Sequence, residues 1–587
     1  MRSTDVTAEG PPPFNRFFRY NELRAILEGW AKSHPTLLRL ESIGRSYEGR
    51  DIWLATVTNF DTGPDRDKPA LWLDANIHAA EVTGCTATLH LIHHLLSGHQ
   101  RDPRVTAVLD TRAFYIVPRL NPDGAELALA DRPRFVRSSV RAYPFSHRRK
   151  GLHEEDVDGD GRILMMRMED PNGAWKAHPE QPRLMVRREP DEPAKAGTFY
   201  RLISEGTLEG YDGVSERPAE PVEGLDLNRN YPMEWSPESE QSGAGPYPTS
   251  EPEVRAMVEA VVARPNITAH ITYHTFSGVH LRPYSSHPDD HFPTKDLVAY
   301  KLIGEKATAL TGYPSASVFH DFKYDPKSTI KGGADDWTYE HLGVFSWTTE
   351  FWSPQRRAGI TDFHLIEWFK EHSVEDDLKL LAWNDEELSG RGYIDWYPFD
   401  HPQLGPVELG GWDLFYCWVN PPPEFLEQEI APHSEFAVYH LLISPRLELQ
   451  RVEVERLGPS TYRITVVVGN SGFLPTNVTA KANERKVCTG VEVELTLGGD
   501  GDQKHARLLT GEAKVELGQL GGRATERSFP SWLDADEPSD RAKAQWVIEV
   551  PTGILRHDSD RHPPGSPVEI EARHPRAGVA RRTIALG

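Results

Sequence analysis

The segment Leu73-Asp-Ala-Asn-Ile-His-Ala-Ala-Glu81 decides the fold of the first part of the chain and points to a site. It places His78 and Glu81 three residues apart, directly after an apolar run from Leu71 to Asn76 that is predicted to form a buried strand. At this spacing both side chains can face one point. Zinc ions in hydrolytic sites take three nitrogen or oxygen ligands and leave one position for water. The pair therefore predicts two ligands of a metal centre whose third ligand is distant in the sequence.

The spacing of this pair carries little information by itself, because it recurs elsewhere. His364 and Glu367 have the same spacing, as do His372 and Glu375, and both pairs lie in the stretch from Phe363 to Trp383, which has helical apolar periodicity. The polar face of an amphipathic helix accounts for these two pairs. The metal interpretation of the first pair therefore depends on the rest of the chain.

The residues around the first segment predict an α/β fold, with a mixed central sheet flanked by helices. Strand-like and helix-like segments alternate through this part of the chain. We expect the domain to span residues 1–389, with a large insertion at about residues 150–222. Its predicted elements include strands from Ala113 to Val117, Ile267 to Tyr273 and Val344 to Thr349, and a closing helix from Phe363 to Trp383.

The composition changes after about Ser389, which predicts further domains. Residues 390–435 are rich in aromatic residues and proline and are predicted to form a linker. Residues 436–587 contain short alternating runs, such as Tyr462 to Val468, separated by clusters of Gly, Asn and Asp. Such alternation is typical of strands with one buried face. We therefore expect a C-terminal β-sandwich of immunoglobulin-like type.

The composition also limits the classes of function. The 65 Lys and Arg residues face 88 Asp and Glu residues, and the resulting formal net charge of −23 disfavours binding to nucleic acids. No segment has transmembrane length, and the N-terminus lacks the apolar core of a secretory signal, so we expect a cytoplasmic protein without membrane contact. The three cysteines, Cys85, Cys417 and Cys488, are too few and too scattered for a disulfide framework.

Further motifs follow one another along the chain in a fixed order. They are Ile43-Gly-Arg-Ser-Tyr-Glu-Gly-Arg50, Pro118-Arg-Leu-Asn-Pro-Asp-Gly124, Asp226-Leu-Asn-Arg-Asn-Tyr231, His274-Thr-Phe-Ser277 and Gly332-Gly-Ala-Asp-Asp-Trp337, which leads to Glu350. With these motifs the sequence resembles the zinc carboxypeptidase family typified by carboxypeptidases A and B, over roughly Ile43 to Trp352. The resemblance implies the fold of that family and one zinc ion held by His78, Glu81 and His274.

The resemblance also implies roles for residues around the metal. Asp226 matches the carboxylate that orients a ligand histidine, and Glu350 matches the general acid/base. Asn228 and Arg229 match the pair that binds the free C-terminal carboxylate of a peptide substrate. Arg149, which lies in a basic run, resembles the arginine that polarises the scissile carbonyl.

The sequence departs from the family pattern in two ways. The loop Ser328-Thr-Ile-Lys331 lacks the mobile tyrosine of the pancreatic-type enzymes, and Tyr324 is the candidate substitute. The insertion carries Asp156, Asp158 and Asp160, whose carboxylates either bind calcium or form an acidic turn. The loop is not a complete EF-hand, because the final acidic ligand is missing.

The predicted function is that of a zinc-dependent metallocarboxypeptidase. Asp335 falls where the carboxypeptidase B type places an Asp that pairs with a C-terminal Lys or Arg, although a helix cap explains it equally. A second interpretation keeps the same site and assigns an amidohydrolase that acts on cell-wall peptides or N-acyl amino acids. A third, a non-catalytic binding protein, is disfavoured because the three ligands, Glu350 and the arginines are all retained. The oligomeric state stays open.

Overall fold

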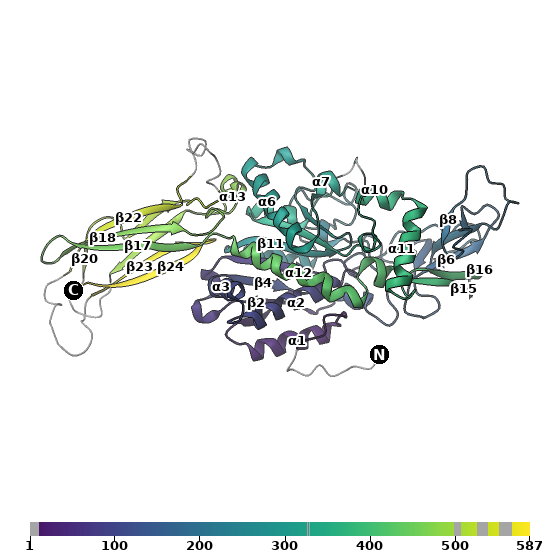
Figure 1. The fold of residues 1–587 in the computed structure, drawn as a ribbon, viewed down its shortest axis with the longest axis horizontal. Helices are drawn as coiled ribbons and strands as arrows, with labels where there is room; N and C mark the ends of the chain where they lie inside the picture. Colours follow the sequence, from purple (N-terminus) through teal and green to yellow (C-terminus); the bar gives the residue numbers. More distant parts are fainter. Residues whose placement is uncertain are drawn as a thin grey trace.

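The computed structural model describes residues 11–323, 325, 327, 329–497, 506–524, 538–550 and 566–586. Figure 1 shows an elongated molecule with an α/β body in the middle, a β-sandwich at one end and a smaller sheet at the other end. The predicted α/β domain and the predicted C-terminal β-sandwich are therefore both confirmed. The smaller sheet is a unit that the sequence did not predict.

The α/β body is built on a mixed eight-stranded sheet with the order β1-β2-β4-β3-β11-β14-β12-β13. The four central strands β4, β3, β11 and β14 run parallel to one another, whereas β2 and β12 flank them in the antiparallel direction. The strands are β1 (Leu38–Arg45), β2 (Asp51–Val57), β3 (Ala70–Ala75), β4 (Ala113–Val117), β11 (Ile267–Thr275), β12 (Val279–Arg282), β13 (Ser315–Ser317) and β14 (Phe345–Phe351).

Helices cover both faces of this sheet, which explains why every residue of the central strands β3, β4, β11 and β14 is buried. In β3, Leu71 and Leu73 belong to one core cluster and Ala70 and Trp72 to another, as the two-residue period of a strand requires. The first cluster includes residues of α1 (Tyr20–Ser33), α2 (Thr83–Gly98), α3 (Pro103–Thr111), α6 (Thr294–Thr311) and α12 (Pro423–Leu442), and the second includes residues of α5 (Pro252–Val262) and α8 (Ala334–Leu342). Shorter helices are α4 (Pro122–Ala128), α7 (Val318–Asp321) and α9 (Pro354–Arg357).

The predicted closing helix is two helices in the structure, α10 (Leu365–Lys370) and α11 (Val374–Glu387). The side chain of Ser373 accepts a hydrogen bond from the backbone N–H of Asp376 and so caps the start of α11. Serine side chains that bond to nearby backbone groups favour a helix start over a helix interior. The apolar periodicity correctly indicated helical structure, but it did not predict the break between α10 and α11.

Residues 390–435, predicted as a linker, are instead part of the folded body. β15 (Tyr393–His401) pairs with β16 (Gly405–Trp412), and β16 pairs with β6 (Met165–Glu169) of the insertion. The resulting six-stranded sheet has the order β15-β16-β6-β9-β7-β8 and joins the insertion to the chain after residue 389. Its other strands are β7 (Trp175–Ala177), β8 (Met185–Arg187) and β9 (Tyr200–Ser204), while β5 (Gly151–Glu154) and β10 (Gly206–Glu209) pair separately.

The proline-rich run that indicated a linker begins helix α12. Pro423 occupies the first turn of this helix. Proline is favoured there because its φ is already helical and the first turn needs no backbone N–H. α12 then buries Leu426, Ile430 and Phe436 in the larger core cluster. The prolines of this run thus lie at the start of a helix, and its aromatic and apolar residues form the buried face of that helix.

The C-terminal domain is a sandwich of two antiparallel four-stranded sheets that share one apolar core. The first contains β17 (Leu447–Arg456), β18 (Thr461–Asn470), β22 (Arg541–Glu549) and β20 (Arg507–Thr510). The second contains β21 (Lys514–Gly518), β19 (Val491–Leu497), β23 (Ser566–His574) and β24 (Gly578–Leu586). A short helix, α13 (Ala480–Arg485), lies at the junction with the body, beside α6 (Figure 1).

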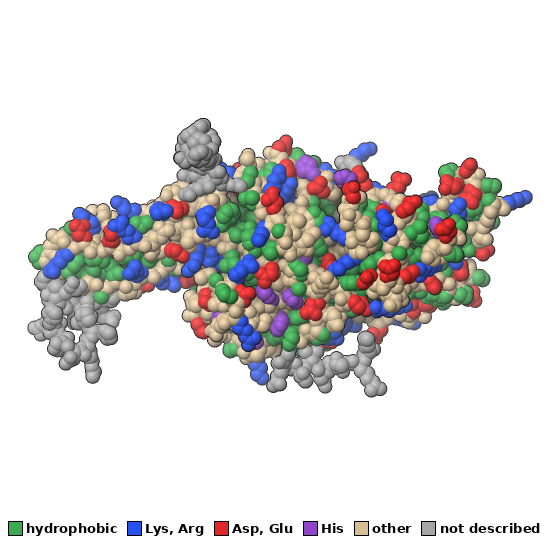
Figure 2. All heavy atoms as spheres, viewed as in Figure 1, with side chains coloured by type: hydrophobic (Ala, Val, Ile, Leu, Met, Phe, Trp, Pro, Cys, Tyr) green, Lys and Arg blue, Asp and Glu red, His purple; other side chains and the backbone are tan. Residues whose placement is uncertain are grey.

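The surface, the helices and the cysteines were also subjects of expectations from the composition. Acidic and basic side chains are intermingled over the face shown in Figure 2, without one large basic patch. Within the described ranges, none of the helices combines the length and the apolar character that a bilayer crossing needs. Cys85, Cys417 and Cys488 are all free thiols.

Candidate active site

The candidate site lies at the C-terminal edge of the parallel strands. His274 is near the end of β11, and the parallel register places it directly opposite Glu350 on β14. On the other side β11 pairs with β3, where Tyr273 lies opposite Ala75. Because the ends of parallel strands meet at one edge of a sheet, these residues from distant parts of the sequence lie together.

The turn after β3 carries the first two candidate ligands. Asn76 adopts a positive φ of 59°, which asparagine tolerates better than most residues. Its side-chain amide donates hydrogen bonds to the carbonyl oxygens of His78 at 2.7 Å and Ala79 at 3.3 Å. These bonds hold the turn that presents His78 and Glu81 before α2 begins.

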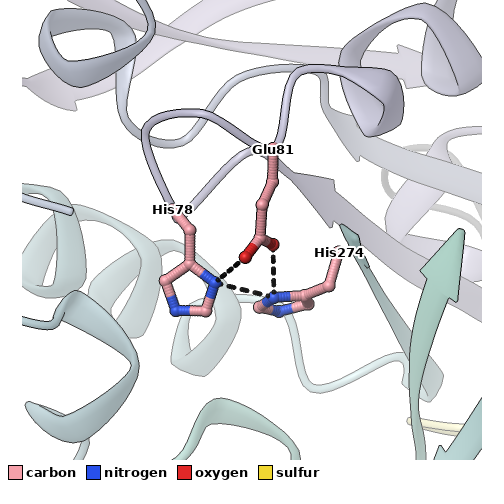
Figure 3. A group of neighbouring side chains, drawn as sticks. All are labelled: His78, Glu81 and His274. Carbon is pink, nitrogen blue, oxygen red and sulfur yellow. Dashed lines mark hydrogen bonds and ion pairs between the residues drawn. The ribbon is translucent and has the colours of Figure 1, made fainter. Parts of the chain in front are cut away.

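The candidate ligand atoms of His78, Glu81 and His274 converge on one point (Figure 3). Nδ1 of His78 lies 2.9 Å from Oε1 of Glu81, and Nδ1 of His274 lies 3.1 Å from Oε2 of Glu81. The two Nδ1 atoms are 3.1 Å apart, and all three side chains are buried. The structure thus brings together the three residues that the resemblance names as ligands.

Asp226 orients the ring of His78. Nε2 of His78 donates to Oδ1 of Asp226 at 3.1 Å, which leaves Nδ1 unprotonated toward Glu81. Although burial opposes ionisation, the charges of Arg137 and Arg229 hold the pKa of Asp226 well below its usual range. A carboxylate in this position fixes the orientation of a ligand histidine and raises its basicity.

Thr272 and Asp74 orient the ring of His274 in the same way. The Thr272 hydroxyl donates to Oδ1 of Asp74 at 2.9 Å, so it accepts from Nε2 of His274 at 3.3 Å. Nδ1 of His274 is then also unprotonated and faces Glu81. Two nitrogen lone pairs and a carboxylate at these separations repel one another unless a cation lies between them.

The donor set and its spacing fit a zinc ion. Two imidazole nitrogens and one carboxylate are a ligand set of catalytic zinc. Tetrahedral ligands at about 2.1 Å from zinc lie about 3.4 Å from one another. The separations of 2.9 to 3.1 Å between the candidate atoms are close to this value.

Glu350 is a buried carboxyl group next to the candidate metal centre. Its side chain lines both cavities of the site, and Oε2 has no hydrogen-bond partner among the described residues. Burial, and after it the negative charge of Glu81, raises the pKa of Glu350 well above its usual range. Such a group can take up and release a proton beside a reacting molecule.

Arg137 lies in the site although the sequence analysis did not select it. Its Nε donates to Oδ2 of Asp226 at 3.1 Å, and a terminal nitrogen lies 3.3 Å from Oε1 of Glu81. Its carbonyl oxygen accepts from the backbone N–H of Ala79, which ties its segment to the ligand turn. In the sequence Arg137 stands between apolar Phe135-Val136 and two serines, and other arginines are close by, so no local pattern distinguishes it.

Arg149, which the resemblance indicates for the scissile carbonyl, is not brought to the site. Its side chain is 49% exposed, lies over the ring of Phe145 at 4.6 Å and pairs with Glu220 at 3.8 Å. It lines neither cavity. The reason is that the chain leaves the cleft here to enter the insertion, so the basic run 147–150 faces solvent.

Asn228, Arg229 and Asp335 line a small cavity of about 50 Å³ together with His78 and Glu350. The side-chain oxygen of Asn228 accepts from the backbone N–H of residue 334 at 2.9 Å, so its amide nitrogen is the part that can donate to a ligand. Arg229 donates to the carbonyl oxygen of Asn228 at 2.7 Å. Asp335 accepts from the hydroxyl of residue 348 at 3.1 Å.

A second cavity, of about 520 Å³, also borders the candidate metal centre. The two cavities share His78, Arg137, Phe322 and Glu350, so they meet at the candidate metal centre. The larger one is mainly apolar and is lined by residues from several elements, including Phe135, Phe276, Phe322, Ile366, Phe369 and Lys370.

Two predictions concern residues away from this centre. Tyr324 lies outside the described residues. Asp156, Asp158 and Asp160 do lie together, with carboxylate oxygens within 4.8 Å of one another. Each also accepts hydrogen bonds from the protein, from Gly159 and Gly161, from Tyr397 and from Arg162 respectively. The described contacts therefore match an acidic turn, and calcium stays a prediction.

The chain belongs to the zinc carboxypeptidase family, whose family model matches residues 23–376, more than half of the chain. A model for a domain of unknown function matches residues 446–585, which form the β-sandwich. Family membership agrees with the mixed α/β sheet and with the histidine and glutamate ligand set described above.

Individual relatives are distant. A zinc carboxypeptidase of Saccharothrix mutabilis subsp. capreolus is 30% identical over 124 residues, which are 21% of this chain and 28% of that protein. Carboxypeptidase A2 of Rattus norvegicus is 27% identical over 339 residues, 56% of this chain and 61% of the relative, so less than two thirds of either relative is covered. Among solved structures, carboxypeptidase A from Helicoverpa armigera is similar with a TM-score of 0.38 and 18% identity, over 66% of this chain and 76% of that one.

Proposed function

We propose that this chain is a zinc-dependent metallocarboxypeptidase, which removes C-terminal amino acids from peptides. The observation that carries the proposal is the convergence of His78, Glu81 and His274 within 3.1 Å, beside the buried Glu350. Membership of the zinc carboxypeptidase family supports the same reaction class.

Different residues of the cleft have different roles in peptide hydrolysis. Zinc, when held by His78, Glu81 and His274, supplies a Lewis acid that acidifies water and polarises a carbonyl group. Oε2 of Glu350 accepts a proton from the attacking water and passes it to the nitrogen of the leaving amine. Arg137 donates to the carbonyl oxygen of the scissile bond, where negative charge develops.

The small cavity holds the C-terminal residue of the substrate. Arg229 and the amide group of Asn228 bind the free carboxylate, because a planar guanidinium matches the geometry of that group. Asp335 lies in the same cavity and favours a terminal Lys or Arg side chain.

The large cavity holds the residues that precede the scissile bond. It opens from the same centre, and aromatic side chains including Phe276 and Phe369 line it, with ring centroids 5.3 Å apart. Phe369 is 38% exposed, so part of its surface can contact a bound peptide. We therefore expect bulky apolar residues to be preferred upstream of the terminal residue.

The test is hydrolysis of N-blocked dipeptides that end in Phe, Leu, Lys, Arg or Glu, with and without a zinc chelator. Release of the terminal residue that the chelator abolishes and added zinc restores supports the proposal. If the chain binds one equivalent of zinc but cuts no peptide, the carboxypeptidase proposal fails and amide substrates such as N-acyl amino acids become the next to assay.

A further inference from the structure

Helix α8 connects the small cavity to the C-terminal β domain. Asp335, in its first turn, lines the cavity, and the helix ends at Leu342. Nine residues of helix are about 13 Å long. The two ends of α8 therefore have different neighbours, substrate at one end and the β domain at the other.

The β domain holds the C-terminal end of α8 through Arg576, which is 4% exposed and lies between β23 and β24. Its guanidinium donates to the carbonyl oxygens of Gly343 at 2.9 Å and Asn477 at 3.0 Å, and also to that of Leu342. The hydroxyl of Thr479 donates to the Gly343 carbonyl at 2.7 Å. Carbonyls at the end of a helix lack partners within it, and a cation there also complements the helix dipole.

The same end of α8 carries Glu340, a buried carboxylate that binds two cations of α13. Lys481 lies 3.2 Å from it, and Arg485 pairs with its other oxygen. The helix itself is close against α13, because a Cβ atom at Gly343 would lie 2.5 Å from Cα of Ala482. Only glycine can occupy position 343 at this separation, so the end of α8 is closely packed against α13.

α13 is also fixed to the α/β body. The Asp296 carboxylate of α6 accepts from the backbone N–H groups of Ala480 at 2.7 Å and Lys481 at 3.0 Å, and from the hydroxyl of Tyr339 at 2.8 Å. Figure 1 shows α13 beside α6 at this junction. The contacts that hold the C-terminal end of α8 are therefore part of an extended buried polar interface.

Glu340 links this interface to the substrate cavity. Its Oε2 accepts from the hydroxyl of Tyr284 at 2.5 Å. The next residue, Ser285, lines the small cavity, and its backbone N–H lies 3.1 Å from both carboxylate oxygens of Asp336. Asp336 adjoins Asp335, so few contacts separate the β domain from the cavity wall.

We propose that the C-terminal β domain positions the substrate cavity, through the hold of Arg576, Lys481 and Arg485 on α8. The effect of the β domain on substrate binding rests on the proposed carboxypeptidase function. Its effect on the conformational order of α8 does not depend on that function. Arg576 is a positioning residue, because it lines neither cavity of the site. In this proposal the C-terminal β domain keeps the wall of the small cavity in an ordered position.

The test compares Arg576→Met and Arg485→Met with the control Arg463→Met. Arg463 pairs with Glu455 on the surface of the same β domain and makes no described contact with α8. Hydrogen exchange is followed at residues 283–287 and 333–338 of the full chain. We expect faster exchange there in both test variants and wild-type exchange in the control.

The kinetic readout separates positioning from loss of folded protein. We expect KM for dipeptides to rise roughly 2- to 30-fold in the Arg576 variant, with kcat per zinc-loaded molecule nearly unchanged. A merely structural role would lower the active fraction and leave KM unchanged.

Wild-type exchange and wild-type KM in folded Arg576→Met and Arg485→Met would overturn the inference. If Arg576→Met does not fold, Arg485→Met decides, since the Arg485 side chain is 48% exposed and its loss is better tolerated. If the wild-type chain cuts no peptide, the proposed function fails, and hydrogen exchange alone decides the positioning role.

Discussion

Glu350 on β14 lies directly opposite His274 on the parallel strand β11. One strand thus carries a candidate metal ligand, and its neighbour carries the carboxyl group that we propose as the general acid/base. The register of two buried strands sets their separation, so neither position depends on a surface loop.

Replacement Glu350→Gln is expected to lower kcat by about 10²- to 10⁴-fold, because the amide cannot carry the proton. Bound zinc should stay at the wild-type level, since His78, Glu81 and His274 are unchanged. Steady-state hydrolysis and elemental analysis of the purified variant measure both. The control is Glu367→Gln on α10, an exposed glutamate of a second His-x-x-Glu spacing. Wild-type turnover in Glu350→Gln would remove it from the mechanism.

Arg137 and Arg149 form a matched pair of variants. We expect Arg137→Met to lower kcat/KM by about 10²- to 10³-fold, because it removes a donor for the developing oxyanion. Arg149→Met should leave kcat/KM nearly unchanged, since that side chain lines neither cavity. Hydrolysis of one dipeptide by both variants checks this. The reverse ranking would restore the assignment to Arg149 that the resemblance implies.

Asp226→Asn is expected to weaken zinc binding by roughly 10- to 100-fold, because a neutral amide is a poorer partner for Nε2 of His78. Competition with a metallochromic indicator measures the affinity directly and needs no substrate. The conservative variant keeps the size of the side chain, so a change in affinity reports its charge. Unchanged affinity would show that His78 does not need this partner.

Asp335→Ile is expected to reverse the preference for the terminal residue. Removal of the negative charge from the small cavity should lower kcat/KM for Arg-ended dipeptides by about 10-fold or more and raise it for Phe-ended ones. The ratio of the two kcat/KM values is the measurement. Equal cleavage of Phe-ended and Arg-ended peptides by the wild-type chain would contradict the proposed basic preference.

Glu253 on α5 gives a prediction about stability and pH. Burial is the main cause that raises the pKa of this carboxyl to about 7. A raised folded pKa means that the contribution of Glu253 to stability is fully present below its unfolded pKa and is lost as the pH rises through about 7. Relative to wild type, Glu253→Gln should therefore gain up to about 3 kcal/mol of unfolding free energy between about pH 5 and pH 8.

Urea unfolding at several pH values measures the difference between Glu253→Gln and the wild-type chain. Glu259→Gln, an exposed position on the same helix, is the control and should show no such trend. A difference that stays constant across this pH range would mean that Glu253 does not keep its proton in the folded state.

The sequence by itself determined the class of fold and the candidate ligands, because these depend on local patterns. The apolar run before His78 predicted strand β3, and the alternation around Tyr462 predicted a strand of the β-sandwich. Ordered motifs then indicated the family, and through it His274 and Glu350. The structure brings these residues together at one edge of the sheet.

The tertiary structure alone decided which residues outside those motifs reach the site and how the domains join. Arg137 faces the cleft and Arg149 faces solvent, because the path of the insertion decides where each segment lies. The strands of residues 393–412 complete the sheet of the insertion, and Arg576 caps α8 from more than two hundred residues away. Strand partners and helix caps of this kind form between segments distant in sequence, so no local pattern of residues specifies them.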